Sequence, residues 1–245
     1  MINQTEEASI LVYARVAGLA YLLTIILGIV GVNIIASSLI VSGDDSATVK
    51  NIVENGLLFR VGIATEVLMY VLVILLSFTL YVVLKSVNRN LAMLALLWRL
   101  AEAIVGAATT VLSGLIPLLI LSNENSFKPE QVDSLVGLFL NVRAAGLDIV
   151  LIFIGMGGTL FFYLFFKSNF IPRLLAAWGM LTYLLMLILS FASILLPTIS
   201  ESTKMIFYAP GGLFEILVGL WLLIKGINIE QWKKFASRNY NKDIN

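Results

Sequence analysis

The chain contains no cysteine and no histidine, and only 13% of its residues are charged. Without cysteine it can form no disulfide and no thiolate-ligated metal site. Without histidine it lacks the commonest general base and the commonest metal ligand. The net charge of +1 gives no reason to expect nucleic acid as a partner. We therefore expect no cofactor, no metal centre and no nucleic-acid interface.

What the chain has in excess is apolar sequence. Hydrophobic residues make up 60% of its 245 residues. A soluble domain of this size could not cover its surface with so few polar residues, so we expect an integral membrane protein. The first apolar stretch is too long for the core of a signal peptide and follows Glu6 and Glu7 instead of basic residues. We take it as a true first span.

A transmembrane helix needs about 20 predominantly apolar residues. Six stretches qualify, at roughly 16–41, 61–84, 91–116, 144–166, 173–197 and 209–225. The sequence thus predicts an all-α bundle of six transmembrane helices. Pro172 and Pro210 mark the expected starts of spans five and six, and Pro197 the expected end of span five. Pro117 should stop or kink span three, and a short helix should begin at residues 128–130 and run into span four.

Basic residues predict the orientation. Ten of the sixteen Lys and Arg residues fall on one side of the six spans, five fall on the other, and Arg99 lies inside span three. By the positive-inside rule, both termini are expected in the cytoplasm. The division we expect is a six-helix transmembrane domain at 1–228 and a cytoplasmic, amphipathic, basic tail at 229–245, which lies on the inner leaflet.

Span four resembles span two at a constant offset. Glu66 aligns with Asp148, and Tyr81 aligns with Tyr163. Glu66 and Tyr81 lie on one face of span two, and Asp148 and Tyr163 lie on the equivalent face of span four. Span six carries a shorter version of the pattern around Glu215. The sequence therefore predicts three repeated helical hairpins, formed by spans 1–2, 3–4 and 5–6, around a common axis.

Span three holds two charged residues, Arg99 and Glu102, on a stripe of small residues. Small residues let neighbouring helices approach closely, so the stripe should face protein. The two side chains are three positions apart and can touch. Such an intramembrane pair either fixes helix packing or belongs to a functional site, and the sequence leaves both open.

The candidate site comprises seven residues, which are Arg99, Glu102, Glu66, Asp148, Glu215, Tyr81 and Tyr163. If the four acids converge, they outnumber the one arginine, and some must hold protons or bind a cation. Alternatively, each acid pairs with an arginine on a neighbouring helix or caps a helix end. We favour this alternative for Glu66 and Asp148 and leave Glu215 open.

Composition also limits the classes of function. An intramembrane serine protease needs a general base, and the sequence has no histidine to serve as one. An intramembrane aspartyl protease needs two aspartates within the spans, and only Asp148 lies in a span. The glycines at 155–158 lie mid-membrane and are typical of helix packing. We expect no enzyme. Two hypotheses remain. In the first, the helices enclose a polar pocket that binds or transports a small molecule, lipid headgroup, cation or proton. In the second, the protein is a structural or regulatory membrane subunit. The expected partners are the lipid bilayer, such a ligand, and a membrane protein or second copy.

Four segments carry a family resemblance: Val87 to Glu102 (VNRNLAMLALLWRLAE), Gly146 to Phe153 (GLDIVLIF), Tyr163 to Arg173 (YLFFKSNFIPR) and Trp221 to Trp232 (WLLIKGINIEQW). They resemble a family of bacterial multi-pass membrane proteins known only as a domain of unknown function. The resemblance implies a bacterial cytoplasmic membrane and supports Arg99, Glu102, Asp148 and Glu215 as family-like positions. Family members often have a histidine near the position of residues 141–143, and its absence here argues against metal chemistry.

Overall fold

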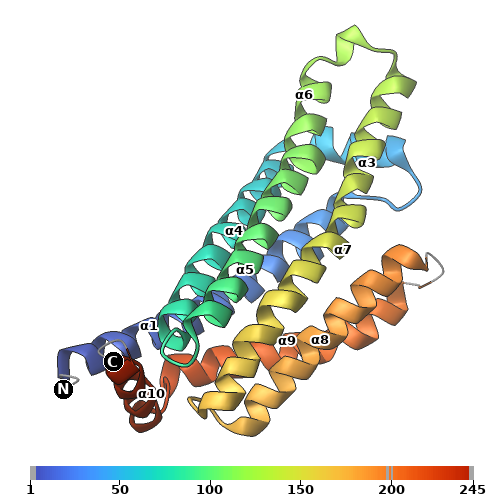
Figure 1. The fold of residues 1–245 in the computed structure, drawn as a ribbon. Helices are drawn as coiled ribbons and strands as arrows, with labels where there is room; N and C mark the ends of the chain where they lie inside the picture. The colour runs from blue at the N-terminus through green and yellow to red at the C-terminus, as the bar shows by residue number, and fades with distance from the viewer. Residues whose placement is uncertain (1–3, 197–198, 200, 243–245) are drawn as a thin grey trace. The chain divides into compact units, whose positions relative to one another are not determined.

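The computed structural model describes residues 4–196, 199 and 201–242, and these residues contain helices and no β-strand (Figure 1). In chain order the helical elements are α1 (Gln4–Gly28), η1 (Ile29–Ala36), α2 (Ser37–Leu39), α3 (Asp45–Glu54), α4 (Gly56–Leu84), α5 (Arg89–Thr110), η2 (Val111–Leu115), α6 (Ile116–Ser122), η3 (Glu124–Ser126), α7 (Pro129–Ser168), α8 (Arg173–Leu195), α9 (Glu201–Ile224) and α10 (Ile229–Lys242). The expectation of an all-α protein is confirmed.

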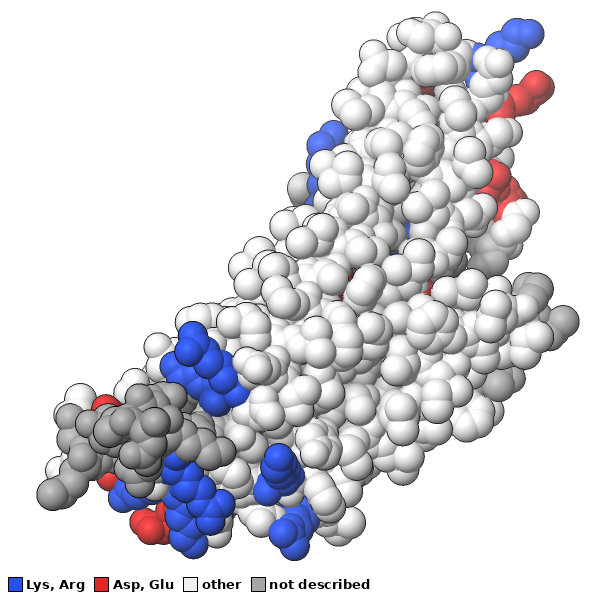
Figure 2. Space-filling model, in the orientation of Figure 1, with Lys and Arg blue, Asp and Glu red and all other residues white. Residues whose placement is uncertain are grey.

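Among the described residues, six helical stretches are long and apolar enough to cross a membrane. They are Gln4–Leu39, Gly56–Leu84, Arg89–Ser122, Pro129–Ser168, Arg173–Leu195 and Ile206–Ile224. Much of the visible surface in Figure 2 is free of charged side chains, as lipid contact requires. The predicted number of spans is confirmed. Several helices are longer than predicted, because helical hydrogen bonding continues into flanking residues where hydropathy falls.

Proline positions were predicted with mixed success. Pro172 precedes α8 as its N-cap, and α7 begins at Pro129 and continues through span four, as expected. The prediction for Pro210 was wrong, because α9 begins at Glu201 and Pro210 lies inside it. Proline is tolerated inside a membrane helix where neighbouring groups satisfy the backbone carbonyl that it leaves free. Pro197 lies outside the described residues.

Two spans contain π-helical turns, which the sequence did not predict. η1 interrupts the first span, and η2 directly precedes α6, in which Pro117 stands near the start. A proline ring clashes with the carbonyl four residues earlier, which here belongs to Ser113 inside η2. The wider π-turn accommodates this clash. Pro117 therefore does not stop the span, because the helix continues to Ser122. A kink at this residue stays a prediction.

The helices divide into two compact units, and the first consists of residues up to Ile25, Leu72–Glu102 and Leu151 onward. Its core is aromatic where α7, α8 and α9 meet. The ring of Phe162 on α7 stacks on Tyr183 of α8, with ring centroids 5.6 Å apart. Phe214 of α9 meets Phe162 edge-on at 4.8 Å. These rings pack directly beside the polar groups described below.

The second unit consists of Ile26–Val71 and Ala103–Val150. Its buried core is aliphatic apart from one phenylalanine, and it contains Ile35, Leu39, Ile52, Phe59, Val132, Val136 and Leu140. Helix α3 closes over this core after an N-cap in which Asp44 Oδ1 accepts a hydrogen bond of 2.8 Å from the Ala47 N–H. The predicted hairpin repeat stays a prediction.

Candidate functional site

Arg99 and Glu102 form the predicted ion pair on α5, in the first unit. Arg99 Nη1 lies 2.7 Å from Glu102 Oε2, and the two side chains are only 8% and 2% exposed. Among the described residues, no donor forms a hydrogen bond of good geometry with Glu102 Oε2. The pair is therefore held by charge, and the carboxylate oxygen keeps hydrogen-bonding capacity to spare.

Two adjacent glycines on α7 make room for this polar cluster. A Cβ atom on Gly157 would lie 2.7 Å from Cγ of Arg99, and one on Gly158 would lie 2.4 Å from Cγ of Tyr183. Distances this short are essentially never seen for a real Cβ atom. The glycines expected to serve helix packing thus do so, against α5 on one side and α8 on the other.

The same unit holds polar side chains from three further helices. The Tyr183 hydroxyl on α8 donates to Glu215 Oε1 on α9, at 2.7 Å. The Tyr21 side chain on α1 interacts with Tyr183. The Arg99 guanidinium also interacts electrostatically with Tyr21, Tyr183 and Glu215. The cluster therefore contains one guanidinium, two carboxyl groups and two phenols.

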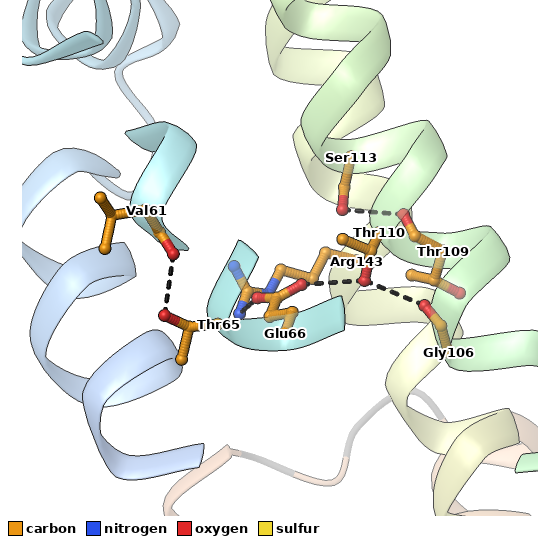
Figure 3. Close-up of polar contacts among 8 residues, drawn as sticks. All are labelled: Val61, Thr65, Glu66, Gly106, Thr109, Thr110, Ser113 and Arg143. Atoms are coloured by element: carbon orange, nitrogen blue, oxygen red, sulfur yellow. Dashed lines mark hydrogen bonds and ion pairs between the residues drawn. The ribbon is translucent and has the colours of Figure 1, made fainter. Parts of the chain in front are cut away.

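The second unit holds its own polar cluster, shown in Figure 3. Glu66 Oε1 on α4 forms an ion pair with Arg143 Nη2 on α7. Thr110 of α5 donates to Glu66 Oε2 at 3.0 Å and also contacts the Gly106 carbonyl. An arginine on a neighbouring helix was the favoured alternative for Glu66, and the structure confirms it. Three helices meet at this carboxylate.

A small cavity adjoins the Glu66–Arg143 pair. Its volume is about 20 Å³, and its lining includes Gly31 of η1 and Ser113 of η2 as well as both charged residues. A site of this volume with polar partners can hold about one water molecule. Both π-helical segments therefore border the same cavity beside the ion pair, and such segments often occur at functional sites.

The other predicted residues lie elsewhere on α4 and α7. Asp148 is buried on α7 within the second unit. Tyr81 of α4 packs against the apolar core of the first unit, and Tyr163 of α7 is 39% exposed. The four acids thus divide between the units, with Glu102 and Glu215 in one and Glu66 and Asp148 in the other. One centre shared by all four stays a prediction.

Sequence reasoning missed Tyr183, which donates to Glu215, and Tyr21, which interacts with Tyr183. Tyr183 stands on a stripe of α8 that also contains Ala176, Gly179 and Ser190, all buried. Their spacings of three, four and seven residues mark one side of the helix as protein-facing, and Tyr183 is the only large polar residue among them. That pattern could have identified Tyr183. Tyr21 lies among alanines, glycine and leucine, and no comparable signal identifies it.

No curated protein and no solved structure is similar enough to this chain to count as a match. One family model does match, over residues 16–226, which include most of the first span, the five other spans and both clusters. Its description is a domain of unknown function, DUF4386. The match agrees with the resemblance seen in the sequence and covers most of the chain. The protein belongs to the DUF4386 family.

Proposed function

We propose that the protein is a non-enzymatic, multi-pass membrane protein that binds and transfers a proton at the cluster of Arg99, Glu102 and Glu215. With both carboxyl groups ionised, this cluster would carry a net negative charge inside the membrane. An uncompensated charge there costs at least about 2.5 kcal/mol. A single proton shared between two interacting carboxyl groups removes that cost.

The Tyr183–Glu215 hydrogen bond of 2.7 Å, beside the Arg99–Glu102 pair, is the observation that carries this proposal. A phenol both donates and accepts, so Tyr183, which donates to Glu215, can pass a proton by reversing that hydrogen bond. A cluster that served packing alone would need no phenol on a carboxyl group. This is why we favour proton binding over a small molecule.

The absence of catalysis is part of the proposal. Several hydroxyl groups within the spans donate to backbone carbonyls of their own helix, among them Ser77, Thr79 and Thr109. A nucleophilic hydroxyl must instead contact a base that activates it. With no histidine or cysteine in the sequence, these hydroxyl groups support helix structure and not bond cleavage.

Reconstitution into liposomes tests proton transfer. We expect the wild-type protein to move protons along an imposed potential, as reported by a pH-sensitive dye inside the vesicles. Glu102→Gln and Glu215→Gln should each abolish the flux, because either change makes the cluster neutral without a bound proton. Infrared spectra should lose a protonated-carboxyl band in both variants. Glu124→Gln, at an exposed position outside the spans, is the matched control.

Two results would contradict the proposal. Wild-type vesicles that leak protons no faster than empty vesicles would exclude transfer. A wild-type infrared spectrum without a protonated-carboxyl band would exclude proton binding itself. Folding of each variant is checked by size-exclusion chromatography, so that loss of flux is not mistaken for loss of protein.

A structural or regulatory subunit is the second candidate function. The Glu66–Arg143 pair favours it, because this pair and Thr110 join three helices of the second unit. Affinity purification in mild detergent should then recover a stoichiometric membrane partner. Repeated isolation of the protein alone would count against this function.

We also propose in which membrane the protein lies and which way its termini face. The excess of basic residues on one side supports a protein with both termini in the cytoplasm. The resemblance noted in the sequence supports the cytoplasmic membrane of a bacterium.

A further inference from the structure

A second feature of the first unit is unrelated to the buried cluster. A cavity of about 410 Å³ opens between the α7–α8 linker and the α9–α10 linker. Its lining residues are Asn169, Phe170, Ile171, Pro172, Arg173, Trp221, Lys225, Gly226, Ile227 and Asn228. The cavity therefore lies where helices α8 and α9 reach the end of their spans.

The two linkers are fixed to each other. Asn169 and Gly226, which end α7 and α9, have φ angles of 56° and 69°, in the left-handed region that terminates helices. Each linker turns sharply there. The Asn228 N–H then donates to the Phe170 carbonyl at 2.8 Å, from one linker to the other. A backbone hydrogen bond between two tight turns gives the cavity a defined wall.

The lining selects for an anion. Arg173 and Lys225 are both exposed and both line the cavity. None of the ten lining residues is acidic. The cavity also borders the start of α8, where Pro172 as N-cap offers no side-chain acceptor to the first-turn N–H groups. An arginine fork, a lysine charge and helix N–H groups are a combination that suits phosphate.

The rim of the cavity suits an amphiphilic ligand. Trp221 is 36% exposed in the lining, and tryptophan prefers the headgroup level of a bilayer. Leu174, next to Arg173, is 84% exposed and offers an apolar contact. Figure 2 shows Lys and Arg side chains gathered at the end of the molecule where α10 lies in Figure 1. A phosphate here could thus come from a lipid headgroup or from solution.

We propose that this cavity is a binding site for a phosphate group, with Arg173 and Lys225 as its ligands. The position of the cavity at the end of the spans and its Trp221 rim favour the anionic headgroup of a phospholipid as the source of this phosphate. The proposal does not depend on proton binding, because none of the buried cluster residues lines this cavity.

Native mass spectrometry of the purified protein with added phosphatidylglycerol tests the site. We expect a one-to-one complex whose affinity falls at least about tenfold in Arg173→Gln/Lys225→Gln, since each charge-assisted hydrogen bond contributes strongly. The matched control is Lys85→Gln/Arg89→Gln, which removes the same two residue types from another exposed linker. The control should bind within about twofold of wild type. Both pairs are exposed, so neither change disturbs the core.

Further measurements distinguish the sources and can overturn the proposal. Brominated phosphatidylglycerol should quench Trp221, and Trp221→Phe should lose that quenching. Inorganic phosphate that binds as tightly as the lipid and displaces it would identify a soluble phosphate ligand instead. Equal loss of affinity in the two double variants would indicate general charge attraction and overturn the site. Absence of any one-to-one complex with lipid and with inorganic phosphate would overturn it too.

Discussion

At the scale of single residues, Arg99 is the side chain on which most of the first cluster depends. Its guanidinium neutralises Glu102 within the same helix, and its stem fills the space left by Gly157 on α7. An ion pair within one helix does not by itself join two helices. The contact with Gly157 does, so Arg99 contributes to packing and to charge balance at once.

Removing the arginine alone should be costly. In Arg99→Leu, Glu102 is left buried without its partner, and the free energy of unfolding should fall by about 3 kcal/mol. Arg99→Leu/Glu102→Leu should recover most of that loss, because no unpaired charge remains. Thermal unfolding in detergent, followed by intrinsic fluorescence, measures both. A double variant as unstable as the single one would show that the shape of Arg99 matters more than its charge.

Half of this arrangement could be predicted from sequence. The spacing of Arg99 and Glu102 within one helix determines that they meet. Glu66 and Arg143 lie on different helices, so their pairing depends on helix rotations that no local pattern specifies. The place of Tyr163 in a site stays a prediction. It shares a helical face with other polar residues, and the packing leaves it 39% exposed.

At the scale of helices, α1 and α9 approach each other closely in the first unit. A Cβ on Gly18 would lie 2.4 Å from the backbone nitrogen of Leu223 and 2.6 Å from the carbonyl oxygen of Gly219. These are backbone atoms, which cannot move aside as a side chain can. The two helices therefore touch at a point that only glycine allows.

Gly18→Ala should separate these helices. We expect a loss of about 2 kcal/mol in the free energy of unfolding, as for other overpacked sites. Gly212→Ala is the matched control, because no atom lies within 4 Å of a Cβ built on that exposed glycine of α9. Thermal unfolding in detergent should show a lower midpoint for Gly18→Ala and no loss for the control. Equal midpoints would mean that α1 and α9 are not in backbone contact.

Helix α10 is attached to the start of α1 by a second type of contact. Lys233 Nζ lies 2.8 Å from Glu7 Oε1 and 3.8 Å from Glu230 Oε1. The hydrogen bond with Glu7, followed by the charges of both acids, raises the pKa of Lys233 above its ordinary value of 10.5. Because the bound state has the higher pKa, the attachment is complete below 10.5 and is lost as pH rises through the raised value.

Limited proteolysis across alkaline pH checks this attachment. Cleavage of the tail should accelerate as pH rises beyond the ordinary lysine range, because Lys233 loses its proton and its charge. In Glu7→Gln the tail should be cleaved faster already at neutral pH, with less further change on alkalinisation. Lys234→Gln, an exposed neighbour, is the control and should resemble wild type. A tail whose cleavage ignores both pH and Glu7 would contradict the contact.

Hydropathy predicted where helices exist more reliably than where they begin. It identified six spans because an apolar stretch of membrane length must satisfy its backbone as a helix. It could not reveal η1 or η2, since a π-turn depends on one surplus residue in the helical register and not on composition. The predicted start of span six at Pro210 was wrong for a related reason, because a membrane helix can continue past a proline.

At the scale of the whole molecule, the proposed orientation places α10 and the start of α7 on opposite sides of the membrane. The absence of cysteine makes this directly measurable, because any introduced thiol is unique. Ser134→Cys on α7 and Ser237→Cys on α10 both change exposed residues.

A membrane-impermeant maleimide should label Ser134→Cys in intact cells, and Ser237→Cys only after permeabilisation. Wild type should show no labelling under either condition. The reverse pattern would invert the protein in the membrane, and equal labelling of both thiols in intact cells would place both on the outer side.

Helix α7 has 40 residues, which at 1.5 Å per residue is about 60 Å. The hydrocarbon is about 30 Å thick, and even a tilt of 40° lengthens the crossing only to about 40 Å. Roughly a third of the length of α7 therefore exceeds what one crossing of the hydrocarbon needs, and Glu130 and Asp133 near its first turn favour that end as the part outside. An antibody fragment raised against the folded protein could bind an epitope on the first turns of α7 without contacting lipid.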